Sequence, residues 1–198
     1  MLHRICLLLC TLALASCATS TLDAQTKAAL RTVYVEVQLP KPAHVVPIEG
    51  GALAVAYGKT SPIPGEAADR FDEVVVKQVG LSAFIRAQAT QELRRKGYQV
   101  TEDASQSDAR VRFIVYHGLG VASVLASDRG VAMTVNLEVV RNPGDKRVLF
   151  AIANTLDEPE RKRLRTAPAR EWFNNDALIV EQYHLVAKAL TVKALSGM

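Results

Sequence analysis

The sequence contains few cysteines and only a small excess of positive charge, and each of these features excludes some classes of function. Of its three cysteines, Cys6 and Cys10 lie within the first ten residues, so Cys17 has no cysteine partner further along the chain. We therefore expect no disulfide and no thiolate metal site, and stability has to come from core packing. The formal net charge of +4 is too mild to indicate nucleic acid as a partner.

Long apolar runs are also scarce. The run over residues 5–15 is too short to span a bilayer, since a transmembrane helix needs about 20 apolar residues. It follows His3 and Arg4 and ends in small residues, an order typical of a secretory signal peptide. We therefore expect residues 1–16 to be a signal peptide that is removed. No later stretch is long or apolar enough to cross a membrane.

The end of this run carries a specific motif. Leu14-Ala15-Ser16-Cys17 matches the lipobox, and the N-terminus resembles that of bacterial lipoproteins. The resemblance implies that Cys17 carries diacylglycerol through a thioether and becomes the N-acylated first residue. Ala18 is not the aspartate that retains enterobacterial lipoproteins in the inner membrane, so the resemblance implies a lipid-anchored, periplasm-facing protein of the outer membrane. The alternatives are an ordinary signal peptide with a chance cysteine and an uncleaved membrane anchor.

The residues after the motif divide into a tether and a domain. We expect 17–29 to be a lipidated N-terminus and tether with few core contacts, and 30–198 to be a single α/β domain. Apolar and polar residues alternate over 32–39, which predicts a half-buried strand. Residues 43–70 predict either a contact surface for a partner or membrane, or a flap that covers the protein's own core. The flap is preferred, because uncharged loops more often pack than bind.

Hydrophobic periodicity predicts the remaining elements. Helical spacing over 79–96 predicts a helix that Gly97 ends, followed directly by a strand over 98–101 in a right-handed crossover. Three alternating strands follow, and a final apolar helix begins after an Asn-Asn-Asp cap at 174–176. The first strand covers 109–116, and the second covers 131–139 with Val135 facing inward. The third strand has Val148, Phe150 and Ile152 as its inward set. Residues 142–145 are expected to join the second and third strands in a hairpin.

Familiar catalytic and ligand motifs are incomplete. Gly118-Leu119-Gly120 lacks the third glycine and the following helix of a dinucleotide loop, so a turn or bulge is expected. The histidines at 44, 117 and 184 have no metal-ligand spacing and are expected at the surface or its boundary. No Gly-x-Ser-x-Gly elbow is present. We therefore predict no catalytic residue, no cofactor and no metal.

Two further stretches allow two readings each. The basic run over 161–170 is either a patch for phospholipid or lipopolysaccharide phosphate or a solvated loop balanced by neighbouring acids, and the loop is preferred. Trp172 and Phe173 are either a binding pair or a hydrophobic staple that sets the start of the last helix.

The element order predicts a two-layer α/β sandwich (α+β): a mixed, mostly antiparallel sheet of about five strands with two main helices on one face. This order loosely resembles small envelope lipoproteins with domains like the N-terminal domain of TolB. The predicted function is a non-enzymatic accessory or assembly subunit of the Gram-negative envelope, bound to membrane lipid through acylated Cys17 and to an envelope protein. The alternatives are a periplasm-facing binding protein for a lipid, glycan or peptidoglycan fragment and, ranked last, an envelope hydrolase.

Overall fold

The computed structural model describes residues 21–40, 65–121, 128–141 and 146–198. The predicted signal peptide, the lipobox motif with Cys17, Ala18 and residues 41–64 lie outside these described residues. The predictions made for them therefore stay predictions. The hairpin turn over 142–145 and His44 lie outside them as well.

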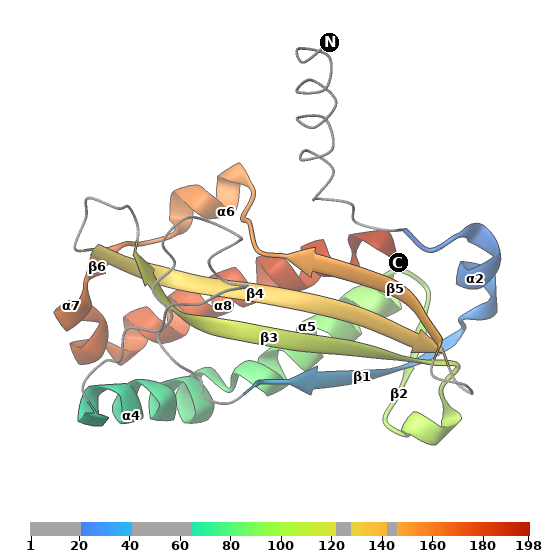
Figure 1. Cartoon of the computed structure of the whole chain (residues 1–198), viewed down its shortest axis with the longest axis horizontal. Coiled ribbons are helices and arrows are strands. Elements are labelled where there is room, and N and C mark those ends of the chain that lie inside the picture. Colours follow the sequence, from blue (N-terminus) through green and yellow to red (C-terminus); the bar gives the residue numbers. More distant parts are fainter. Residues whose placement is uncertain (1–20, 41–64, 122–127, 142–145) are drawn as a thin grey trace, which may run out of the picture.

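A mixed sheet forms one layer of the fold (Figure 1). Its strand order is β2-β1-β3-β4-β5, and the two-residue β6 pairs with β4. β1 runs parallel to β2 and β3, whereas β4 is antiparallel to β3, β5 and β6. The strands are β1 (Thr32–Gln38), β2 (Gln99–Thr101), β3 (Ala109–Val121), β4 (Asp128–Arg141), β5 (Lys146–Ala153) and β6 (Ala167–Pro168).

Helices form the second layer. The two long ones, α5 (Leu81–Arg95) and α8 (Asp176–Ala194), lie side by side across one face of the sheet (Figure 1). The two-layer sandwich with two main helices on one face is thereby confirmed. The shorter elements are α2 (Ala24–Ala29), α4 (Gly65–Glu73), the π-helix η1 (Val74–Val79), the 3-10 turns η2 (Ala104–Gln106) and η3 (Leu195–Gly197), α6 (Glu158–Arg163) and α7 (Ala169–Asn174).

Local signals in the sequence set the helix boundaries. Gly80, with φ of 56°, separates η1 from α5, and Gly97, with φ of 93°, follows the end of α5. Such left-handed conformations are ones that glycine adopts without a side-chain clash. At the start of α8 the Leu178 amide donates to Asn175 Oδ1 over 3.0 Å, so the predicted polar cap is the one observed.

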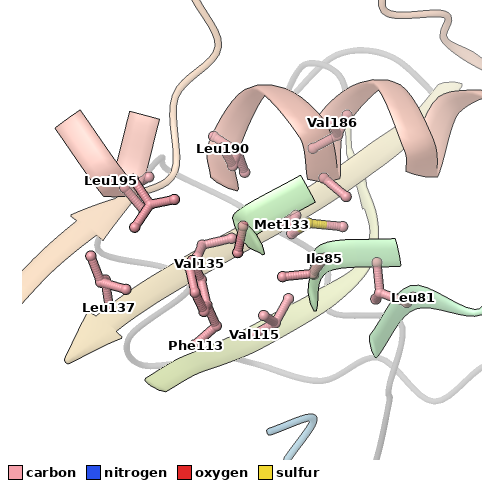
Figure 2. Packing of buried hydrophobic residues seen from close by; sticks show 14 of the residues in the cluster. Leu81, Ile85, Phe113, Val115, Met133, Val135, Leu137, Val186, Leu190 and Leu195 are labelled. Carbon is pink, nitrogen blue, oxygen red and sulfur yellow. The ribbon is translucent and has the colours of Figure 1, made fainter. Parts of the chain in front are cut away.

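The core lies between the sheet and the two long helices (Figure 2). Phe113, Val135 and Leu137 project from β3 and β4 toward Ile85 of α5 and Leu190 of α8, and all five are buried. We call this the inner face of the sheet and the opposite side the outer face. The inward direction predicted for Val135 is correct.

The predicted inward set of β5 is wrong for Phe150 and Ile152, whereas Val148 is half-buried against the core. Leu149, Ala151 and Ala153 are the buried residues, while Phe150 and Ile152 are 37% and 51% exposed. The pairing explains the reversal: Val140 pairs with Arg147 but Val139 pairs with Leu149, so Val148 is an extra residue in a β-bulge. One extra residue moves every later side chain to the other face of the strand.

The segment before β1 is also packed more closely than expected. Leu22 and Leu30 are buried in the core cluster, and the Leu22 amide donates to the Gly197 carbonyl over 2.9 Å. Asp23 caps α2 by accepting from the Thr26 amide over 2.8 Å. The described part of the predicted tether is therefore a helix attached to the domain. A buried leucine at each end of α2 holds it there.

Candidate functional site

The outer face of the sheet is the candidate site, because the described helices α5 and α8 pack on the opposite face. Five large hydrophobic residues are exposed among the described residues, and three of them lie here: Tyr116, Phe150 and Ile152. Tyr116 comes from β3 and is 43% exposed, and the other two come from β5. Exposed aromatic and aliphatic side chains on a rigid strand framework are typical of contact surfaces.

A chain of charged side chains crosses the same face. Arg112 Nε lies 3.1 Å from Glu36 Oε2, and Arg112 Nη1 lies 3.4 Å from Glu138 Oε2. Arg147 Nη1 lies 3.3 Å from Glu138 Oε1. We call Glu36, Arg112, Glu138 and Arg147 the charge network; it joins β1, β3, β4 and β5 in that order.

The strand register puts this network next to the exposed apolar residues. Arg112 pairs with Glu138, which in turn pairs with Phe150, so all three side chains share one row. The Arg147 guanidinium lies 5.3 Å from the centre of the Phe150 ring, a cation–π distance. The next row carries Ile114, Asn136 and Ile152. The surface is therefore mixed, with apolar patches held between fixed charges.

The network also keeps Glu36 ionised. Burial raises the pKa of Glu36, but hydrogen bonds from Gln38 and Arg112 outweigh that effect and keep the pKa below its usual value. The Gln38 amide donates to Glu36 Oε1 over 2.7 Å. Glu36 thus presents a carboxylate in a fixed orientation, which suits recognition of a partner's cation or hydrogen-bond donor.

Two oxygens on this face lack a partner among the described residues: Thr134 Oγ1 and Asn136 Oδ1. Both belong to β4: Thr134 lies in the Tyr116 row, and Asn136 lies between that row and the network row. A buried polar atom without a hydrogen bond costs about 1–3 kcal/mol. Their pairing partners on β3 are Tyr116 and Ile114, and neither side chain donates a hydrogen bond to them.

A second cluster, formed by His117, Tyr183 and Phe71, lies inside the fold. His117 Nδ1 lies 3.2 Å from the Tyr183 hydroxyl, and Phe71 packs edge-on against Tyr183 at 5.9 Å between ring centres. Burial lowers the pKa of His117 to about 4 and, together with Asp72, raises that of Tyr183 well above its usual value. Both groups are therefore neutral near pH 7, and both are buried. This cluster packs the core and offers no open nucleophile or base.

The prediction for His117 needs correction, whereas His184 lies at the boundary of the surface, as expected. His117 was expected at a strand end near the surface, but β3 continues to Val121 and the His117 side chain faces inward. The ring of His184 stacks on Phe84 at 4.1 Å, and its Nε2 lies 3.0 Å from the Val79 carbonyl oxygen. The strand extends through the two glycines at 118 and 120, which are strand residues and not a turn. The sequence predicted a turn or bulge here because glycine in a strand interior is unfavourable.

The basic run and the aromatic pair both resolve into structural roles. Arg161, Arg163 and Arg165 are exposed, and Lys162 pairs with Glu158 over 2.8 Å on α6, as expected for a solvated charged segment. Trp172 is buried and donates from Nε1 to the Arg129 carbonyl over 2.9 Å. Phe173 packs edge-on against Phe71 at 6.3 Å. The pair is therefore part of the packing around α7.

Ligand and membrane features are limited to the following. The described residues contain no group of three His, Cys, Asp or Glu side chains placed to hold a metal ion. Among the same residues, no helix combines the length and hydropathy needed to cross a membrane.

Sequence reasoning missed the apolar part of the outer face, because the bulge at Val148 that turns Phe150 outward leaves no sequence signal of its own.

Comparisons with known proteins give only distant likenesses. No protein-family model and no curated protein matches the chain. A protein from Xanthomonas campestris described under the family model DUF330 is 10% identical, with a TM-score of 0.43 over 90% of this chain and 91% of that one. A PelC variant from Paraburkholderia phytofirmans, solved as a dodecamer, is 12% identical, with a TM-score of 0.41 over 91% and 93% of the two chains.

A third structure comes from Helicobacter pylori and is named as a homologue of a neuraminyllactose-binding hemagglutinin. It is 15% identical, with a TM-score of 0.39 over 90% of this chain and 88% of that one. Likeness at this level carries no functional inference. The function has to be argued from the residues of this chain.

Proposed function

We propose that this chain is a lipid-anchored envelope protein that faces the periplasm from the outer membrane and serves as a non-enzymatic accessory or assembly subunit. In this proposal Cys17 carries the lipid and the outer face of the sheet binds an envelope protein. The lipobox over 14–17 supports the anchor, and the composition of the outer face supports the docking role.

The single observation that carries the docking role is the pairing of exposed apolar side chains with a fixed charge network. Tyr116, Phe150 and Ile152 supply apolar area, while Arg112 and Glu138 lie in the same row of the sheet as Phe150. Protein interfaces place aromatic and arginine anchors at their centre and polar groups around them. The closed His117–Tyr183 cluster gives no support to a hydrolase, because its groups are buried and neutral.

The anchor is tested by replacing Cys17 with alanine in the full chain. We expect Cys17→Ala to lose palmitate labelling and to leave the precursor uncleaved by the lipoprotein signal peptidase, because the thiol is the acceptor of the diacylglycerol. Cys10→Ala is the matched control, since it removes a thiol from the signal run without touching the lipobox, and it should be labelled like the wild type. Palmitate labelling that survives Cys17→Ala contradicts the anchor.

The docking face is tested in intact cells with a photoreactive residue placed at Tyr116 or at Ile152. Both positions should give the same discrete protein adduct, because they lie on one face. A photoreactive residue at Lys188, which is exposed on α8, is the matched control and should give none. An adduct that forms equally from all three positions, or from Lys188 alone, contradicts docking on the outer face.

A further inference from the structure

The sheet has two edge strands, and they differ in length. β2, at one edge, has three residues, Gln99–Thr101. β5, at the other edge, has eight residues, Lys146–Ala153, and lies at the margin of the sheet in Figure 1. A very short edge strand is one way in which proteins avoid pairing with other chains. Of the two edges of the described sheet, β5 is therefore the one long enough to pair with a further strand.

Most of β5 has a strand on one side only. Among the described residues, β5 pairs with β4 and with no other strand. No turn, loop or helix within the same part of the chain bonds to the backbone of Leu149 or of residues 151–153. In an edge strand, alternate backbone N–H and C=O groups point away from the neighbouring strand and need another partner or water. The backbone of this stretch therefore offers hydrogen bonds to an added strand.

Features that protect an edge strand from pairing occur only at the start of β5. Lys146 and Arg147 carry charge, and the bulge at Val148 interrupts the regular ladder there. Residues 149–153 contain no charged residue, no proline and no glycine. Their side chains are apolar on both faces of the strand, and Ile152 is 51% exposed. This stretch therefore has the composition of a strand that pairs on both sides.

The side chains of this stretch match those of a second copy that runs antiparallel. A two-fold axis through Ala151 places Phe150 opposite Ile152 of the second copy on the outer face. Aromatic and β-branched side chains in directly opposite positions stabilise neighbouring strands. On the inner face the same axis places Leu149 opposite Ala153, so a large side chain meets a small one. Both faces of the strand are therefore complementary to themselves.

The charges around β5 are complementary in the same direction. Lys146 and Arg147 begin the strand, whereas Asp157, Glu158 and an acid at position 160 follow its end. Antiparallel pairing brings the basic start of one copy toward the acidic segment of the other, an arrangement that fixes the orientation of an interface. The side chains of Arg147, Asp157 and Glu158 are exposed and form only surface ion pairs within their own chain. Such pairs are weak, so these groups can also face a second copy.

We propose that β5 pairs antiparallel with β5 of a second copy of this chain, so that two sheets join into one continuous sheet. The pairing goes beyond the function proposed above and does not depend on the lipid anchor. The two outer faces then lie on the same side of the joined sheet, because opposite residues of paired strands share a face. One pair of short strands is a small interface, so we expect a dimer that dissociates on dilution.

The first test uses two differently tagged versions of the full chain in the same cells, one of them with a photoreactive residue at Phe150. We expect illumination to give an adduct that carries both tags. Ile152→Lys in both versions should lower the yield of this adduct by about tenfold or more, because a lysine on an edge strand opposes pairing. Val76→Lys is the matched control and should leave the yield unchanged, since Val76 is also an exposed β-branched residue but lies on η1.

The second test measures hydrogen exchange of the backbone amides in the full chain, held in detergent micelles at increasing protein concentration. Strand pairing protects amides, so exchange over residues 149–153 should slow as the concentration rises. The Ile152→Lys chain should show no such change, and thermal unfolding establishes that it folds. Absence of the adduct with both tags overturns the proposal. The same adduct without protection of these amides also overturns it, because the copies then touch through side chains alone.

Self-pairing and the function proposed above fail separately. An adduct with an envelope protein carries one tag, whereas the adduct between two copies carries both. The Cys17→Ala chain lacks the proposed lipid but keeps β5 unchanged, so its amides over 149–153 should still become protected as the concentration rises in micelles.

Discussion

The two faces of the sheet are built from alternate residues of the same strands, yet they differ in almost every property. The inner face presents residues such as Phe113, Val135 and Leu149, all buried against α5, α8 or η3. The outer face presents Arg112, Glu138 and Phe150, which are partly exposed; Arg112 and Glu138 form an ion pair, and Phe150 pairs with Glu138 in the sheet. The fold's stability is therefore concentrated on the inner face, and neither of the two long helices covers the outer one.

This contrast follows from the cost of burying charge. A carboxylate on the inner face would lose its hydration without gaining a partner. On the outer face the same group stays partly hydrated and pairs with arginine, an arrangement worth about 0–1 kcal/mol. The outer face can therefore change its side chains at little cost to folding, whereas the inner face cannot.

The largest expected effect comes from breaking the inner face. Val135→Asp places a carboxylate at a position that is 0% exposed, among apolar side chains of α8 and β3. We expect the cost to exceed about 4 kcal/mol, so that cooperative thermal unfolding is lost. Circular dichroism during heating measures this directly.

The control lies three residues away on the outer face. Glu138→Ala removes two ion pairs but leaves Arg112 bound to Glu36, so we expect a change within about 1 kcal/mol. Equal unfolding midpoints for Val135→Asp and Glu138→Ala would mean that the two faces of β4 are assigned in the wrong order.

The next largest effect is expected on β5, where one bulge decides which residues face the core and which face outward. Leu149 is 2% exposed, so Leu149→Ala should cost roughly 2–5 kcal/mol of unfolding free energy. Phe150→Ala loses a partly exposed ring and a cation–π contact with Arg147, which should cost about 1 kcal/mol. Urea unfolding of the two variants gives the order, and a larger loss for Phe150→Ala would show a strand without the bulge.

The same bulge marks the limit of what the sequence predicts. The sandwich, the long helices and the inward set of β4 follow from hydrophobic periodicity, and each is observed. On β5 both alternating sets are apolar, since Leu149, Ala151 and Ala153 compete with Val148, Phe150 and Ile152. The set that contains Phe150 and Ile152 was expected in the core because these side chains are large. Leu149, Ala151 and Ala153 are the residues that pack under α8 and η3.

The candidate sites were less predictable than the fold. Phe150 and Ile152 reach the outer face through the pairing register, and the charge network joins Glu36, Arg112, Glu138 and Arg147 from four strands. Neither arrangement has a motif, because it exists only after tertiary packing. The lipobox is the reverse case, since its four adjacent residues are sufficient to suggest the chemistry.

A smaller and pH-dependent effect concerns His117, which packs on the inner side. Burial lowers its pKa from 6.5 to about 4 in the folded protein. The unfolded chain therefore binds a proton more readily, and stability falls as the pH drops from about 6.5 toward 4. At about 1.4 kcal/mol per pKa unit, the loss is about 3 kcal/mol.

His117→Gln removes this titration and keeps a polar group near the Tyr183 hydroxyl. We expect a flatter dependence of unfolding free energy on pH between 6.5 and 4, measured by urea unfolding at several pH values. A slope unchanged by His117→Gln would place the acid sensitivity in other groups.

The smallest effect on stability is expected on the outer face, and it is the one that separates recognition from folding. Tyr116→Thr/Ile152→Thr removes two exposed apolar side chains and places threonine, a β-branched residue that suits a strand, at both positions. The unfolding free energy should change by less than about 1 kcal/mol, because both side chains already contact solvent. If the outer face binds an envelope protein, the adduct from a photoreactive residue at Phe150 should nevertheless weaken strongly, because apolar anchors carry most of the binding energy of an interface. Val76→Thr is the matched control, since Val76 is an exposed valine on η1, away from the sheet's outer face, and should leave the adduct intact. A double variant that folds normally and still forms the adduct at full yield would show that these side chains do not bind the partner.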